Sequence, residues 1–140
     1  ALEANSTEDE HDCFSDNTHN SHFYNAKGIR NVYLGEYLKA DGSTLSGPSL
    51  SDLVAKADAQ ADSTLKADLQ ASESKLQALV DSAEKNHVHF DQLIAADNKA
   101  GQQIIRDAIA ALVTQTAAIE QAANKLGISD LNPDTADHQF

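Results

Sequence analysis

The sequence predicts an all-α protein built as an antiparallel helical bundle. Two long segments, at residues 60–86 and 101–126, carry apolar side chains at steps of three and four, the spacing of one face of a helix. Hydrophobic residues make up 41% of the chain and aromatic residues only 5%, and Trp and Met are absent. This composition indicates helices packed through small side chains, and a length of 140 residues fits one domain.

The first helix is expected at residues 16–34. Ser15 or Asp16 is predicted to cap its first turn, because short polar side chains accept hydrogen bonds from the free N–H groups of a helix start. Gly28 weakens the middle of the segment, and the pattern stops at Gly35. Apolar residues recur at helical spacing between these limits: Phe23, Ile29, Val32 and Tyr33.

A loop and a short helix follow. Asp41-Gly42-Ser43 and Ser46-Gly47-Pro48 predict a loop over residues 41–48, and Ser49 is a suitable cap for the next helix. That helix carries Leu50, Leu53 and Val54.

The two long segments should form the centre of the bundle. Residues 86–89 separate them, a short apolar cluster lies at residues 90–94, and Gly127 is placed to stop the second segment. Their matched lengths predict an antiparallel pair. The apolar stripe on each helix is too large for the other predicted helices to bury completely. The predicted stripes are Leu65, Leu69, Ser72, Leu76, Leu79 and Ala83, and Ile105, Ile109, Leu112, Thr116, Ile119, Ala123 and Leu126.

The charge is concentrated at the start of the chain. The net charge is −12, and the first sixteen residues carry six acidic side chains with no Lys or Arg. An acidic surface repels phosphate, so neither nucleic acid nor an anionic membrane surface is expected as a ligand, and cations are the natural counterpart. No apolar run approaches the ~20 residues that span a bilayer, so no membrane-spanning segment is predicted.

Three ordered segments carry a family resemblance. Residues 10–19 (EHDCFSDNTH), 28–37 (GIRNVYLGEY) and 47–53 (GPSLSDL) resemble the C-terminal half of imelysin-like proteins, the family of insulin-cleaving membrane peptidases and iron-regulated proteins. The resemblance extends from about residue 8 through the last helix. It implies an all-helical protein of two bundle-like halves, exported to the periplasm or outer membrane of bacteria and linked to iron uptake or to peptidase activity.

The resemblance also implies which parts this chain lacks. The family's metal motif, Gly-x-His-x-x-Glu, belongs to the N-terminal half, and none of the six histidines here fits it. A divalent metal, Fe or Zn, is therefore expected to be bound mainly by that other half. Residues 1–4 (ALEA) look like the end of a helix, so we expect a fragment whose partner is the N-terminal fragment of the same precursor. The expected organisation is an acidic loop or cleaved segment at residues 1–15, a bundle at 16–128 and a tail at 129–140.

His19 and His22 are the candidate metal ligands within the chain. They are three residues apart, which on a helix places both imidazoles on one face, and neutral imidazole suits Zn, Fe, Ni or Cu. The alternative is a solvated surface pair. Cys13 is the only cysteine, so the chain has neither an internal disulfide nor a zinc site of several thiolates.

A second group of candidates could bind a ligand: Ser15, Asp16, Asn17, Thr18 and Arg30. In the functional interpretation the polar groups face a crevice between the two halves, where Arg30 holds an anionic ligand or a carboxylate. In the structural interpretation they only cap the first helix, and Arg30 lies on the surface. A hydrolase triad of Ser15, His19 and Asp16 is not expected, because residues so close along one helix seldom reach the required geometry.

Two functions remain open from the sequence, beside a purely supporting role for this half. One is a binding protein associated with iron uptake, which holds a metal or an iron-loaded ligand between its halves. The other is part of a metallopeptidase, in which a glutamate of the missing half activates a metal-bound water.

Overall fold

The computed structural model describes residues 1–129 and 131 and confirms the predicted all-α class. The tail predicted at residues 129–140 lies outside the described residues, apart from Ser129 and Leu131. The elements in chain order are α1 (Thr18–Leu34), β1 (Glu36–Leu38), β2 (Thr44–Ser46), α2 (Leu50–Ala57), α3 (Ala59–Asn86), α4 (Phe90–Leu93) and α5 (Lys99–Lys125).

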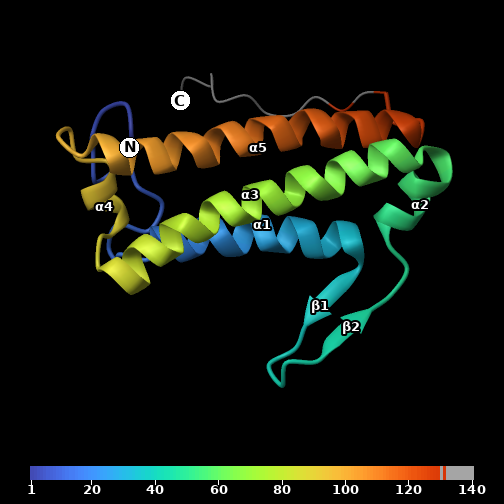
Figure 1. Cartoon of the computed structure of the whole chain (residues 1–140), viewed down its shortest axis with the longest axis horizontal. Helices are drawn as coiled ribbons and strands as arrows, with labels where there is room; N and C mark the ends of the chain where they lie inside the picture. Colours follow the sequence, from blue (N-terminus) through green and yellow to red (C-terminus); the bar gives the residue numbers. More distant parts are fainter. Residues whose placement is uncertain (130, 132–140) are drawn as a thin grey trace.

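Three long helices form the body of the molecule (Figure 1). α3 lies in the middle and runs antiparallel to both α1 and α5, each of which packs along it. The predicted antiparallel pair of long helices is therefore confirmed. α2 covers α3 at one end, next to the end of α1, and α4 packs on α5 at the other end.

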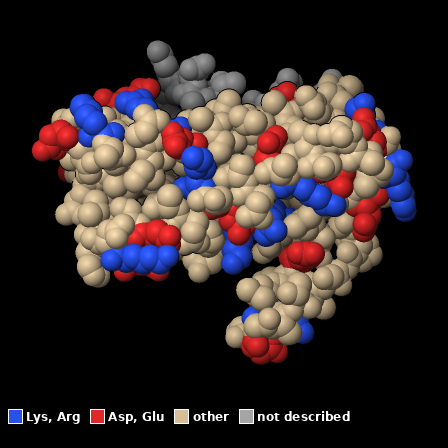
Figure 2. Space-filling view, viewed as in Figure 1, with Lys and Arg blue, Asp and Glu red and all other residues tan. Residues whose placement is uncertain are grey.

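The loop predicted between the first two helices contains a small hairpin. β1 and β2 pair antiparallel, with Tyr37 opposite Leu45, and every residue of both strands is exposed. Gly35 ends α1 with a φ of 65°, and a Cβ there would come 2.8 Å from the carbonyl oxygen of Gly47, so only glycine fits. Figure 2 shows the hairpin projecting from the helical body.

The first helix starts differently from the prediction. Asn17 is the N-cap residue and makes no side-chain capping bond, so the prediction that Ser15 or Asp16 caps the helix is wrong. Asp16 instead turns the chain into the helix with a left-handed φ of 51°. Ser49, by contrast, caps α2 as predicted: its hydroxyl accepts from the Asp52 backbone N–H at 3.0 Å, and the Asp52 carboxylate accepts from the Ser49 N–H at 3.2 Å.

Helix α3 is the centre of two apolar clusters. All six residues of its predicted stripe are buried. One cluster gathers near α4 and the other near α2. The first contains Phe23, Ala26, Leu76, Leu79, Val80, Phe90, Leu93, Ile94, Ile105 and Ala108, and the second contains Tyr33, Val54, Leu65, Leu69, Ala118 and Ala122.

The buried face of α5 matches the predicted stripe only in part, because Leu112 and Ile119 pack against the two clusters from its edge. Ile105 is buried, but Ile109 is 48% exposed and Leu126 is 37% exposed. Four small residues, at positions 101, 108, 118 and 122, are buried beside Ile105 and two glutamines, and small side chains allow neighbouring helices to approach closely. The residues buried on α5 are Gly101, Gln102, Ile105, Ala108, Gln115, Ala118 and Ala122.

Candidate functional site

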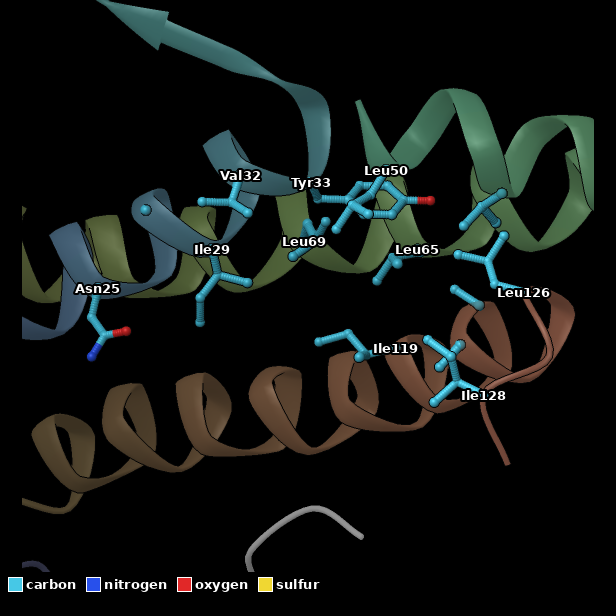
Figure 3. A pocket seen from close by; sticks show the side chains of 14 residues that line it. Asn25, Ile29, Val32, Tyr33, Leu50, Leu65, Leu69, Ile119, Leu126 and Ile128 are labelled. Carbon is cyan, nitrogen blue, oxygen red and sulfur yellow. The ribbon is translucent and has the colours of Figure 1, made fainter. Parts of the chain in front are cut away.

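An apolar groove lies between α1 and α5, with α3 as its floor (Figure 3). Leu65 and Leu69 of α3 form its base, Ile29 and Val32 of α1 one wall, and Ile119 of α5 the other. Its volume is about 540 Å³. The other residues that line it are Asn25, Gly28, Tyr33, Leu50, Val54, Ala122, Ala123, Leu126 and Ile128.

The walls of this groove expose large apolar side chains. Val32 is 70% exposed and Ile128 is 50% exposed. Val32 also borders two neighbouring hollows, one lined by Tyr37 and Leu45 of the hairpin and one lined by residues of α2. Val32 is thus shared by the groove and by both hollows. An exposed apolar area of this kind marks a site where a protein or an apolar ligand binds.

A buried polar network supports the groove from behind. The Asp62 carboxylate, on α3, accepts hydrogen bonds from the Tyr33 hydroxyl at 2.9 Å, the Ser51 hydroxyl at 2.7 Å and the Lys66 ammonium at 2.8 Å. Burial raises the pKa of Asp62, but these three donors outweigh it and leave that pKa below its usual value. Burial and the bond to Asp62 raise the pKa of Tyr33. The network ties α1, α2 and α3 together.

The polar residues at the start of α1 lie away from this groove. Ser15, Asp16 and Asn17 are exposed. Thr18 is fully buried, and its hydroxyl accepts from the Asp12 backbone N–H at 3.0 Å. The structure does not bring these four residues into the groove, which begins two turns further along α1. Their role toward a ligand stays a prediction.

Arg30 is held by an acidic partner. Its guanidinium lies 3.3 Å from the Glu73 carboxylate of α3, and both side chains are largely buried, with 29% and 17% exposure. The pair joins α1 to α3 next to the groove residue Leu69. Arg30 therefore has an acidic partner within the chain, and its role toward a ligand or a carboxylate in a crevice between the two halves stays a prediction.

His19 and His22, the predicted pair of metal ligands, each contact a different histidine. His19 is buried and its ring meets that of His89, with centroids 5.6 Å apart. His22 meets His11, with centroids 5.4 Å apart. Burial and the neighbouring His11 lower the pKa of His22, against a smaller opposite effect of Asp12. Four imidazoles therefore gather where α1 starts and α4 begins.

No group of three or more His, Cys, Asp or Glu side chains is arranged to hold a metal within the described residues. Metal binding by His19 and His22 together therefore stays a prediction. Nothing in the sequence indicated that His89 would meet His19, because seventy positions separate them. Its one sequence signal was Gln92 three residues later, whose side chain accepts from the His89 N–H at 3.0 Å and fixes the start of α4.

A comparison with protein families identifies the family of this chain. Residues 1–119 match the family model Peptidase_M75, described as Imelysin. The chain belongs to the imelysin family. The resemblance inferred from residues 10–53 is thereby confirmed, and the family match runs through α1 to α4 and most of α5. No curated protein matches the chain. None of the helices described in residues 1–129 has the length and hydropathy needed to cross a membrane.

Proposed function

We propose that this chain is the C-terminal half of an exported, imelysin-like bacterial protein that binds a metal or an iron-loaded ligand in connection with iron uptake. In this proposal the chain docks against the N-terminal half of its own precursor, in the periplasm or at the outer membrane. The observation that carries the proposal is the open apolar groove between α1 and α5.

The groove has the form of a helix-binding site. An amphipathic helix is about 10 Å across and presents apolar residues at every third or fourth position, which suits a channel walled by two helices. Such a helix would cover Ile29, Val32 and Leu126, whose side chains are exposed in the chain alone. The family resemblance supports a second helical half as the source of that helix.

The experiment compares two places on the surface in the presence of the N-terminal half. Val32→Asp puts a charge into the groove, whereas Val113→Asp puts the same charge on an equally exposed part of α5 that does not line the groove, the two valines being 70% and 66% exposed. We expect size-exclusion chromatography with mass determination to find a complex for the native chain and for Val113→Asp, and none for Val32→Asp. A complex that tolerates Val32→Asp, or a native chain that stays monomeric beside the N-terminal half, would contradict the proposal.

The second candidate is half of a metallopeptidase, and the description of the matched family as a peptidase favours it. The metal and the general base would then come from the N-terminal half. A peptidase assay on the purified two-half protein, with and without a chelator, separates the two functions. Cleavage that the chelator stops, and that is lost when the glutamate of the upstream motif is replaced, would establish the peptidase and refute a pure binding protein.

A further inference from the structure

A pair of imidazoles lies at the end of the molecule opposite the groove. His19, on the first turn of α1, is only 5% exposed, and its Nδ1 is buried without a hydrogen-bond partner among the residues that the structure describes. His89, at the start of α4, meets it with an edge-to-face geometry and a centroid distance of 5.6 Å. A buried ring nitrogen without a partner is rare in proteins, and an ion or a water that it binds is one explanation.

Asp16 orients the second imidazole of this pair. The Nδ1 of His89 lies 2.9 Å from the Asp16 carboxylate and 3.4 Å from the Asp16 carbonyl oxygen. Two acceptor oxygens beside Nδ1 favour the tautomer that carries its proton there, and this tautomer has its lone pair on Nε2, from which it can bind a metal. A carboxylate behind an imidazole is the usual support of a metal-binding histidine, because it fixes the ring and increases its basicity.

The spacing of the two rings also suits a shared cation. Two imidazoles bound to one tetrahedral zinc ion through Zn–N bonds of about 2.0–2.1 Å have ring centroids about 5 Å apart. The observed centroid separation of 5.6 Å lies close to that value. We propose that His19 and His89, with Asp16 holding His89, bind a divalent transition-metal cation of the zinc and copper class.

The surroundings favour a cation of this class. Imidazole nitrogen selects Zn²⁺, Cu²⁺ or Ni²⁺ over Mg²⁺ and Ca²⁺, which prefer oxygen. The first sixteen residues carry six carboxylates and no Lys or Arg, so the local potential attracts cations. Water would complete the coordination sphere, because the described residues offer no third ligand in place. The site does not depend on the docking proposed for the groove.

The sharpest test uses Asp16→Asn, because it leaves both imidazoles in place. Asn tolerates the left-handed φ of 51° at this position, so the fold should be unchanged. We expect metal-free protein titrated with Zn²⁺ or Cu²⁺ to show one site per chain by calorimetry. Asp16→Asn should weaken it by about 10–100-fold, the usual cost of losing the group behind a ligating histidine. His89→Ala and His19→Phe should abolish it.

Matched controls are available on the same chain. His87→Asn removes an exposed imidazole two residues from His89 at another left-handed position, and His11→Ala removes the partner of His22. Neither should change the affinity, and Cu²⁺ bound to the native chain should show nitrogen ligation by electron paramagnetic resonance. Melting curves of the metal-free variants check that each is folded. The proposal is overturned if no stoichiometric site exists, if Asp16→Asn binds normally, or if His22→Ala abolishes binding while His89→Ala does not.

Discussion

The two ends of the three-helix body are packed to different degrees. The end near α4 is closed: the chain start folds over its cluster, with Leu2 packed against the apolar side chains and the Asn5 side chain donating to the Ile94 carbonyl at 2.6 Å. The end near α2 is open, because α1 and α5 leave a groove between them and Val32 stands 70% exposed.

The difference shows where apolar burial is complete and where it is not. Ile94 at the closed end has no exposed surface, so this region contributes fully to the apolar burial that stabilises the fold. At the open end Leu65 and Leu69 are buried beneath the groove, but the walls above them keep apolar surface exposed to water. That unburied surface is the part of the molecule that gains most from a partner.

The largest expected effect compares a buried residue of the closed end with an exposed residue of α5. Leu79→Asp places a charge at a position that is 2% exposed, whereas Ile109→Asp places it at one that is 48% exposed. A buried unpaired charge costs several kcal/mol, a large part of the ~5–15 kcal/mol that stabilises a typical domain. Leu79→Asp should therefore unfold the chain, and Ile109→Asp should not.

Circular dichroism melts of both variants test this. Both variants introduce an aspartate in place of a large apolar residue of a helix, which cancels most of the difference in helix propensity. If Ile109→Asp melts as early as Leu79→Asp, then α5 buries the stripe predicted from its sequence and the buried face described above is incorrect.

Sequence reasoning succeeded where a single physical rule decided the outcome. The α3 stripe from Leu65 to Ala83 was predictable because only one face of that helix carries large apolar residues, and that face is buried. In α5 the alanines and the isoleucines lie on neighbouring faces, so periodicity could not tell which face meets α3. The buried set takes residues from both faces, Ile105 beside Ala108, Ala118 and Ala122, and this choice depends on the partner helix.

The site was less predictable than the fold for a similar reason. The spacing of His19 and His22 placed both rings on one side of α1, but tertiary contacts gave each a different partner, His89 and His11. The groove also depends on how two helices far apart in sequence are spaced over a third. The sequence indicated only that the stripes needed additional cover.

The next effect concerns the polar network of the open end. Asp62→Ala leaves the hydroxyls of Tyr33 and Ser51 buried without their acceptor, at a cost of about 1–3 kcal/mol. The pKa of Asp62 is lowered in the folded chain. Its ionised form therefore stabilises the fold at every pH above the pKa of the unfolded state, which is about 3.9. This contribution to stability is lost as the pH falls through the lower pKa that Asp62 has in the folded chain.

Chemical denaturation of the native chain and of Asp62→Asn between pH 2 and pH 7 measures this contribution. The difference in unfolding free energy between the two proteins should be largest at neutral pH and shrink as the pH falls below about 4. A difference that is constant over the whole range would mean that the charge of Asp62 does not stabilise the open end.

Two glycines give a smaller and opposite pair of effects. At Gly101, in the closed end, a Cβ would come 2.8 Å from the Cα and carbonyl oxygen of Leu93, so Gly101→Ala should destabilise the chain by about 1–3 kcal/mol. At Gly28, on the groove wall, a Cβ meets nothing within 4 Å, so Gly28→Ala should stabilise α1 by about 0.5–1 kcal/mol. Urea titrations measure the change in unfolding free energy for each variant. If both changes have the same sign, the two ends are packed alike at these positions.

The smallest expected effect lies on the outer surface, where the two ends should not differ. Lys75 of α3 lies 3.2 Å from Asp107 of α5, and their side chains are 50% and 41% exposed. Solvent and salt screen such a pair, so Lys75→Glu should shift the melting temperature by little more than the error of the measurement. The matched variant is Lys125→Glu near the open end, where Lys125 lies 2.8 Å from Asp58 and is also 50% exposed. Both shifts should shrink further in 0.5 M salt. A large shift for Lys125→Glu alone would show that charge pairing, and not only apolar contact, holds the open end of α5 in place.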